Sequence, residues 1–293
     1  MATRGTPFSV LVHPYKSPGM VAAAYELGNP NARNAVVFIG GLHDGPHTTP
    51  YIRAVAKALE EAKHVNYSVF EMRLRSSFIG FGTSSLANDV VDISSLVKYL
   101  RSIGREKIVL FGHSTGCQDC MEYANYGKHQ NEPVDGFILQ APVSDREGLA
   151  PVCPDMDDAI EYATKMIAEG KSDQLVPKDN VPSMVGAPIT AYRLHSLLAK
   201  GGDDDYFSSD LDEETVQTVW GRFTKPVLVA HSENDEYVPK TIDQRKLCKT
   251  YQAANPLVSQ LSDLIPGTGH TVNGEDAQDW LAKRVVEFLA AEV

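Results

Sequence analysis

The sequence predicts an α/β protein with a doubly wound, mostly parallel sheet of eight strands. Apolar runs of strand length alternate with helical patterns along most of the 293 residues. One run breaks sharply into Gly112-His-Ser-Thr-Gly116 and then into another helical pattern. The alternation lapses only between about residues 143 and 212, so we expect a single domain over residues 1–293 with one insertion.

Eight apolar runs are expected to form the strands. The first two lack an intervening helix, which favours an antiparallel start, and helices separate the later ones. The strands are Phe8–His13, Met20–Leu27, Ala35–Ile39, Tyr67–Leu74, Ile108–Phe111, Gly136–Gln140, Val227–His231 and Leu257–Ile265. The helices of this core lie near Tyr51–Lys63, Ala87–Arg101, Cys117–His129, Ile242–Ala253 and Glu275–Ala291.

The insertion at about residues 143–212 is expected to be a helical cap. Asp155–Ala168 and Ile189–Ala199 have helical patterns, Ser183–Ala187 has a loop composition, and an acidic loop follows. The insertion lies between two core strands and on the side of the Gly-x-Ser-x-Gly turn. A cap in that position excludes water and shapes a pocket.

Composition limits the classes of partner. Lys and Arg number 27 against 38 Asp and Glu, a formal charge of −11, and no basic run is present, which argues against nucleic acid or an anionic membrane. No apolar stretch approaches the roughly 20 residues that span a bilayer, and the first residues lack the apolar core of a secretion signal. We therefore expect a cytosolic protein with a small-molecule partner; its oligomeric state stays open.

Two features invite a metal site, and a structural role is favoured for both. Cys117 and Cys120 form Cys-x-x-Cys, but no second Cys or His pair has ligand spacing, and Cys153 and Cys248 are far away in sequence. Asp203–Asp205 lacks the alternating spacing and closing Glu of a calcium loop. Buried reduced thiols and turn-capping carboxylates are the expected roles, with no metal and no cofactor.

The turn around Ser114 has the form of a nucleophile elbow. A strand-to-helix turn this sharp forces the central serine into a strained backbone, and only residues almost without a side chain fit at Gly112 and Gly116. The Ser114 hydroxyl is thereby held out at the carboxyl edge of the sheet. A plain βα turn is the alternative, but the flanking strand and helix favour a nucleophile.

A serine nucleophile needs a base, because its hydroxyl is almost wholly protonated at neutral pH. On elbows of this kind an acid and then a histidine follow the serine in the chain. His270 fits, since it lies in a Gly-rich loop before the last helix. His113, His195 and His231 are expected to be structural.

The acid is expected in the loop after the penultimate strand. Asp235 is favoured by its spacing before Val238-Pro239, and it would accept the second ring proton of His270 and stabilise the imidazolium. Three nearby carboxylates remain alternatives: Glu233, Glu236 and Asp243.

Acyl transfer also needs donors for the developing oxyanion, usually two backbone amides. The elbow supplies the amide of Thr115. The second is expected from Leu42, because an apolar strand there runs into Gly40 and Gly41, which let the backbone approach a substrate. An ordinary Gly-rich turn is the alternative.

A further loop is expected to contribute to the pocket. Ser76, Ser77, Phe78 and Phe81 follow the strand that ends near residue 74, which brings them to the carboxyl edge of the sheet. We expect the first three, with Gly41, to contact substrate; packing of the loop is an equal alternative.

The chain resembles the α/β-hydrolase superfamily and, more narrowly, a mainly fungal family of formerly uncharacterised hydrolases whose best-known members are siderophore esterases. The narrower resemblance lies in Phe38–Leu42 with Asp44-Gly45, Ser76–Leu86, Gly112–Asp119 and Gly201–Asp210, and it extends over nearly the whole chain. It implies cytosolic hydrolysis of ester bonds in hydroxamate siderophores, which releases iron after uptake.

These features together predict a serine esterase that forms an acyl-enzyme through Ser114, His270 and Asp235. A lactonase, thioesterase or acyltransferase would keep every catalytic residue and differ only in pocket and acceptor. A receptor on the same fold would keep the triad without multiple turnover. The exact acyl group does not follow from the sequence.

Overall fold

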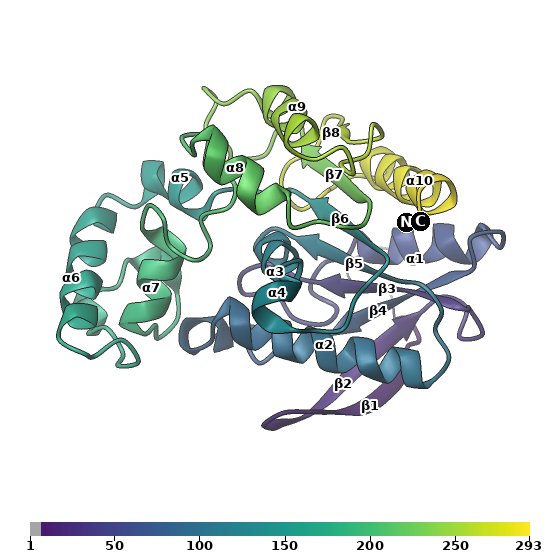
Figure 1. Ribbon diagram of the computed structural model, residues 1–293, viewed down its shortest axis with the longest axis horizontal. Helices are drawn as coiled ribbons and strands as arrows, with labels where there is room; N and C mark the ends of the chain where they lie inside the picture. Colours follow the sequence, from purple (N-terminus) through teal and green to yellow (C-terminus); the bar gives the residue numbers. More distant parts are fainter. Residues whose placement is uncertain (1–6) are drawn as a thin grey trace.

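The computed structural model describes residues 7–293, and these contain one sheet of eight strands. Across the sheet the order is β1-β2-β4-β3-β5-β6-β7-β8 (Figure 1). β2 is antiparallel to β1 and to β4, and every pair from β4 to β8 is parallel. The expected mostly parallel sheet is confirmed. Its strands are Leu11–Ser17, Met20–Leu27, Asn34–Ile39, Tyr67–Met72, Ile108–His113, Gly136–Gln140, Val227–Ser232 and Asp263–Ile265.

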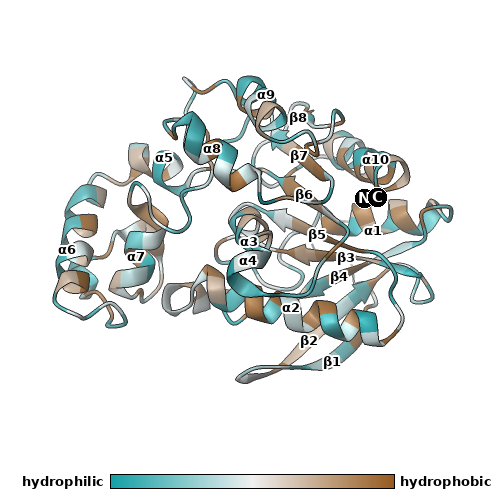
Figure 2. Cartoon of the chain, viewed as in Figure 1, coloured by the Kyte–Doolittle hydropathy of each residue, from teal (hydrophilic) through white to brown (hydrophobic). Residues whose placement is uncertain are grey.

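Helices cover both faces of this sheet. α1 and α10 pack side by side on one face, whereas α2, α3, α8 and α9 share the apolar core of the other (Figure 1). Burial on both faces explains why the central strands are continuous apolar runs, which appear brown in Figure 2. The bounds are α1 Ile52–Glu61, α2 Leu86–Ser102, α3 Gly116–Tyr123, α4 Tyr126–His129, α8 Glu213–Trp220, α9 Gln244–Ala254 and α10 Glu275–Ala291.

A separate lobe lies beside the sheet, at the left of Figure 1. The chain enters it after β6 and leaves it before α8. It has an apolar cluster of its own, in which the buried faces of α6 and α7 meet Phe81 from a short 3₁₀ turn, Gly80–Thr83. The lobe consists of helices α5 Asp145–Leu149, α6 Met156–Ala168 and α7 Ala191–Leu198, with 3₁₀ turns at Ala150–Val152, Lys178–Asn180 and Ser183–Val185.

The first strand begins later than predicted. The sequence indicated Phe8–His13, but β1 covers Leu11–Ser17 and includes Pro14 opposite Ala23. β1 pairs only with β2, and an edge strand tolerates proline because one row of its amides needs no partner. Phe8 instead packs against the ring of His47.

Two other predicted elements were too long. The last strand was expected over Leu257–Ile265, but β8 is only Asp263–Ile265. The side chains of Asn255 and Ser259 accept the backbone amides of Leu257 and Leu261, at 2.9 and 3.0 Å, and turn the chain before the strand.

The helix predicted over Cys117–His129 is broken between α3 and α4. The side chain of Asn125 accepts the amide of Lys128 at 3.2 Å and caps the second, shorter helix. Side chains that bond to their own backbone thus explain both this break and the late start of β8.

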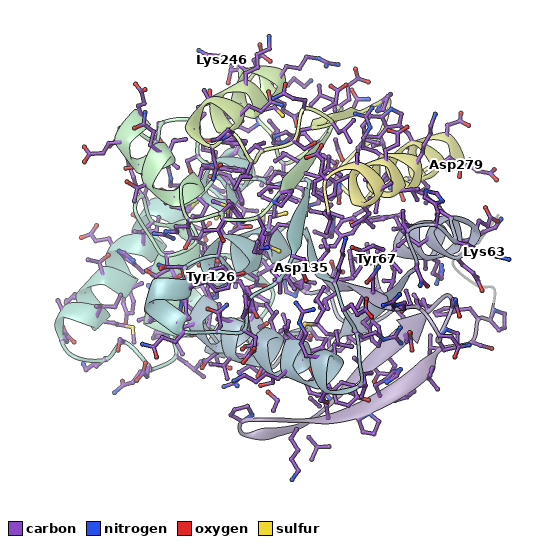
Figure 3. The ribbon with its side chains drawn as sticks, turned by 45° about the vertical axis from the view of Figure 1, so that its right-hand side comes forward. Lys63, Tyr67, Tyr126, Asp135, Lys246 and Asp279 are labelled. Carbon is purple, nitrogen blue, oxygen red and sulfur yellow. The ribbon has the colours of Figure 1, made fainter. Side chains whose placement is uncertain are left out.

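Charged side chains point outward from the helical layers. Figure 3 shows Lys246 on α9 and Asp279 on α10 at the periphery, whereas Tyr67, at the start of β4, is buried. Within residues 7–293 we find no helix with the length and apolarity that crossing a bilayer requires.

Candidate active site

Ser114 occupies a strained turn at the carboxyl end of β5. Its φ is +53°, in the left-handed region that a residue with a side chain rarely adopts. A Cβ at Gly112 would lie 2.3 Å from the carbonyl oxygen of Gly116, and one at Gly116 would lie 2.3 Å from that of Ile39. Only glycine fits at either position, so the chain can turn directly from β5 into α3 and present Ser114 at the edge of the sheet.

His270 is held through both its ring and its backbone. Its Nδ1 donates to Asp235 Oδ2 at 2.8 Å, and both side chains are buried. This bond places the ring proton on Nδ1 and leaves Nε2 as the proton acceptor. The ring edge of Tyr237 lies against His270, with centroids 4.8 Å apart. His270 and Ser114 line the same cavity.

The structure separates Asp235 from the three carboxylates that were open as alternatives. Glu236 Oε2 accepts the backbone amide of His270 at 2.8 Å, and Glu233 Oε2 accepts that of Gly267 at 2.7 Å. Asp243 caps α9 by accepting the amide of Lys246. Of these four acidic side chains, only Asp235 bonds to the imidazole ring.

Backbone amides are available beside Ser114. Gly41 lies so close that a Cβ there would be 2.6 Å from Ser114 Cβ, and its own amide donates to Asp44 Oδ2 at 2.9 Å. The hydrogen bonds of the described residues include none donated by the amides of Leu42 or Thr115. These two donors therefore remain free to bind an anion, as an oxyanion hole requires.

A polar network lies behind the elbow. The Gln140 side chain, at the end of β6, accepts from His113 Nδ1 and from the hydroxyl of Tyr51, and donates to the carbonyl oxygen of His270. Burial, and then the neighbouring His270, lower the pKa of His113 to about 4, so His113 is neutral at pH 7. This network therefore helps to hold Ser114 and His270 in position.

His231 and His195, the other two histidines that we expected to be structural, do not line the cavity of Ser114. His231 is buried at the end of β7, where burial lowers its pKa to about 4. His195 belongs to α7 and is absent from the residues that line the cavity of Ser114.

The cavity that contains Ser114 has a volume of about 260 Å³ and opens between the sheet edge and the lobe. Ser114, His270 and Leu42 line it. The lobe supplies much of its apolar wall, namely Leu149, Met184, Val185, Leu197 and Leu198. Asp145, which sequence reasoning missed, also lines it. Its pKa is raised to about 7, first by burial and then by Asp204.

Ser76, Ser77 and Phe78, which we expected to contact substrate, lie outside this cavity. Ser76 and Ser77 line a second, smaller cavity behind the Gly40–Leu42 loop, and Ser77 Oγ accepts the amide of Leu74 at 3.0 Å. The ring of Phe78 packs on Gly45, where a Cβ would be 2.3 Å away. The loop therefore supports the wall of the site from behind. Gly41 lines both cavities.

The acidic loop that suggested a metal site makes other contacts. Asp203–Asp205 bond to Tyr192, Arg193 and the amide of Gly201. All four cysteines are buried and unpaired. Across residues 7–293, His, Cys, Asp and Glu nowhere gather in a set of three or more that could hold a metal ion.

Comparisons with known proteins place the chain in a family. The family model described as "Protein of unknown function (DUF1749)" matches residues 1–290, and the chain belongs to that family. Esterase AN6793 of Emericella nidulans is 30% identical over 353 residues, covering 97% of this chain and 93% of that protein. Fusarinine C esterase sidJ of Aspergillus fumigatus is 28% identical over 343 residues, covering 97% and 96%.

Solved structures share the whole architecture. The siderophore hydrolase EstB of Aspergillus fumigatus superposes with a TM-score of 0.81 at 26% identity, covering 98% of both chains. A monoglyceride lipase of Saccharomyces cerevisiae has a TM-score of 0.62 at 16% identity, covering 97% of both, and shows the fold alone. The expected α/β-hydrolase fold, the resemblance to a family that includes siderophore esterases and the assignment as an enzyme of esterase type are confirmed.

Proposed function

We propose that this member of the DUF1749 family hydrolyses ester bonds of a hydroxamate siderophore through Ser114, His270 and Asp235. The observation that carries the proposal is the 2.8 Å bond from His270 Nδ1 to Asp235, in the cavity that a strained Ser114 lines. The order of the three residues in the chain is that of the α/β-hydrolase triad.

The reaction proceeds in two halves. Ser114 Oγ attacks the ester carbonyl while His270 Nε2 takes its proton, and the amides of Leu42 and Thr115 bind the oxyanion. The carbon–oxygen bond of the ester then breaks, and His270 returns the proton to the departing alkoxide. Water adds to the acyl-enzyme by the same base, which releases the acid and restores Ser114. Asp235 stabilises the imidazolium in both halves.

The insertion at about residues 143–212 acts as the cap of this site. Its apolar side chains line the cavity of Ser114, so bound substrate would be shielded from water on that side. The apolar wall suits the hydrocarbon part of an acyl group. The described residues that line the cavity include the carboxylates of Asp44, Asp145 and Glu236 but no Lys or Arg, which disfavours an acyl group with a free carboxylate.

The substrate class rests on the relatives. The Aspergillus fumigatus protein that this chain matches over 96% of its length is named as a fusarinine C esterase, and a structural neighbour is named as a siderophore hydrolase. In this proposal the iron belongs to the substrate and the protein needs no cofactor. The cytosolic location expected from the sequence stays a prediction.

Active-site labelling combined with turnover tests the proposal. The protein is incubated with a fluorophosphonate and digested, and the labelled peptide is identified by mass spectrometry. Hydrolysis of p-nitrophenyl acetate and of a hydroxamate triester siderophore is then followed, with Ser114→Ala as the control. We expect label on Ser114 and turnover of both esters, neither of which survives in the variant.

Each of the other possible outcomes of this experiment would correct a different part of the proposed function. Turnover of the simple ester alone would remove the siderophore and favour another acyl substrate, such as a lactone or thioester. A single turnover without release would favour a receptor on the same fold. Label on another residue, or unchanged turnover in Ser114→Ala, would overturn the assignment of the nucleophile.

A further inference from the structure

Arg193 is a buried cation that belongs to the cap and extends toward the rest of the protein. It lies on α7, and only 3% of it is exposed. Its Nη1 donates to Asp204 and to Ser196 Oγ, while Nε has no hydrogen-bond partner among the described residues. A buried charge needs a partner, because removing it from water is costly. Asp204 supplies the partner, and the free Nε–H points to a further acceptor.

The acidic triplet Asp203–Asp205 holds this arginine and the residues around it in place. Tyr192, adjacent to Arg193 on α7, donates its hydroxyl to Asp203. Asp205 accepts the amide of Gly201 at 2.9 Å and fixes the loop that leads from α7 to the triplet. The triplet thus fixes α7 and the turn after it. This is a structural role for a sequence motif that ester hydrolysis alone does not require.

Arg193 reaches a small cavity behind the proposed oxyanion hole. This cavity has a volume of about 30 Å³, enough for a water molecule. Leu42 and Thr115, which carry the two proposed oxyanion donors, line it together with Gly40 and Gly41. Arg193 lies in the wall of the same cavity. The cap and the oxyanion hole therefore share one polar space.

Asp119 lines the same cavity as Arg193 and offers it an acceptor. Asp119, in the first turn of α3, is 5% exposed and its Oδ1 has no partner among the described residues. Burial, and then the neighbouring Asp89, raise the pKa of Asp119 well above its usual value. A water between Arg193 Nε–H and Asp119 Oδ1 would satisfy two buried groups that have no partner within residues 7–293.

We propose that Arg193 is a positioning residue that, through a water shared with Asp119, holds the Gly40–Leu42 loop and Thr115 in the geometry of the oxyanion hole. The inference rests on the proposed esterase function. It makes the placement of the cap a condition for transition-state stabilisation, since Arg193 comes from the cap and the two amides come from the body.

Four variants test the proposal. Arg193→Met removes the guanidinium and keeps most of the volume. Arg193→Met/Asp204→Asn also removes the carboxylate that the single change leaves unpaired, which protects the fold. Arg193→Lys keeps the positive charge. Arg146→Met is the matched control, because Arg146 pairs with Asp205 and Asp210 of the same acidic loop and does not line either cavity.

The readout compares p-nitrophenyl acetate with its thiono ester, in which sulfur replaces the carbonyl oxygen. Sulfur is larger and accepts hydrogen bonds poorly, so well-placed amide donors favour the oxygen ester. The ratio of kcat/KM for the two esters therefore reports the oxyanion hole and does not depend on the amount of folded enzyme. Thermal melting of each variant is measured alongside.

In the double variant we expect a wild-type melting temperature and an unchanged KM. Its kcat on the oxygen ester should fall roughly tenfold to hundredfold, with a matching fall in the oxygen-to-sulfur ratio. Arg193→Lys should recover most of the ratio, and Arg146→Met should not change it.

A wild-type ratio in the folded double variant, or an equal loss in Arg146→Met, would overturn the inference alone. A wild-type protein that neither hydrolyses the ester nor takes label at Ser114 would overturn the proposed function and this inference with it.

Discussion

Glu236 Oε2 accepts the backbone amide of His270 at 2.8 Å, while the preceding carboxylate in the chain, Asp235, accepts from the ring of the same residue. Neighbouring side chains of one loop thus fix both the position and the orientation of the proposed base. A histidine that depends on two such contacts is sensitive to small displacements, because proton transfer requires hydrogen-bond distance.

Glu236→Leu should lower kcat by roughly tenfold or more, because the His270 amide loses its acceptor and the loop moves. Glu236→Gln keeps an acceptor oxygen and should retain most of the activity. Steady-state kinetics on p-nitrophenyl acetate measure both variants. An equal loss in the two would mean that the negative charge, and not the hydrogen bond, is what matters.

Asp235→Asn should lower kcat by roughly 10⁴, as in protease triads, because the amide no longer selects the tautomer with the proton on Nδ1. Asp243→Asn is the matched control. Asparagine caps a helix as well as aspartate does, so this variant should keep the wild-type rate. A mild effect of Asp235→Asn would transfer the role of the acid to another carboxylate of the loop.

Asp89→Asn should raise the free energy of unfolding relative to wild type, and it should do so most at alkaline pH. The pKa of Asp89 is raised to about 7, mainly by burial and in smaller part by Asp92 and Asp204, while Ser76 and Arg193 oppose the shift. The folded state therefore keeps a proton that the unfolded chain loses from about pH 4 upward. Wild-type stability should fall as the pH rises from about 4 to about 7 through this group.

Thermal melts at about pH 5 and about pH 8 measure this effect. The difference between Asp89→Asn and wild type should be larger at the higher pH, because asparagine removes the ionisation that burial penalises. Asp279→Asn, an exposed change on α10, should give no such difference. A constant offset between Asp89→Asn and wild type at the two pH values would contradict the shift.

Gly112→Ala should abolish labelling of Ser114 by a fluorophosphonate. The added Cβ would lie 2.3 Å from the carbonyl oxygen of Gly116, which is backbone and cannot move without displacing the elbow. Gly127→Ala is the control, since a Cβ there meets nothing closer than 3.9 Å. Normal labelling of a folded Gly112→Ala protein would show that the turn tolerates a shift of the backbone.

The sheet and the elbow were predictable because their signals are local. The central strands are buried on both faces, which demands unbroken apolar runs such as residues 227–230, and the tight turn demands glycine at Gly112 and Gly116. His270 followed from its place after the last strand. The strand expected over Leu257–Ile265 failed because Asn255 and Ser259 bond to nearby amides, a competition that apolar patterning does not register.

The sequence by itself determined the fold class, the elbow and the residue types available for catalysis, because burial and steric exclusion act within a few consecutive residues. Only the tertiary structure decided which carboxylate meets His270, that Ser76 lies behind the site, and that Arg193 reaches the cavity beside Thr115. Those relationships join segments far apart in the chain, and they depend on how loops close and which side chains pair. A carboxylate that reaches a ring and one that reaches an amide look the same in sequence.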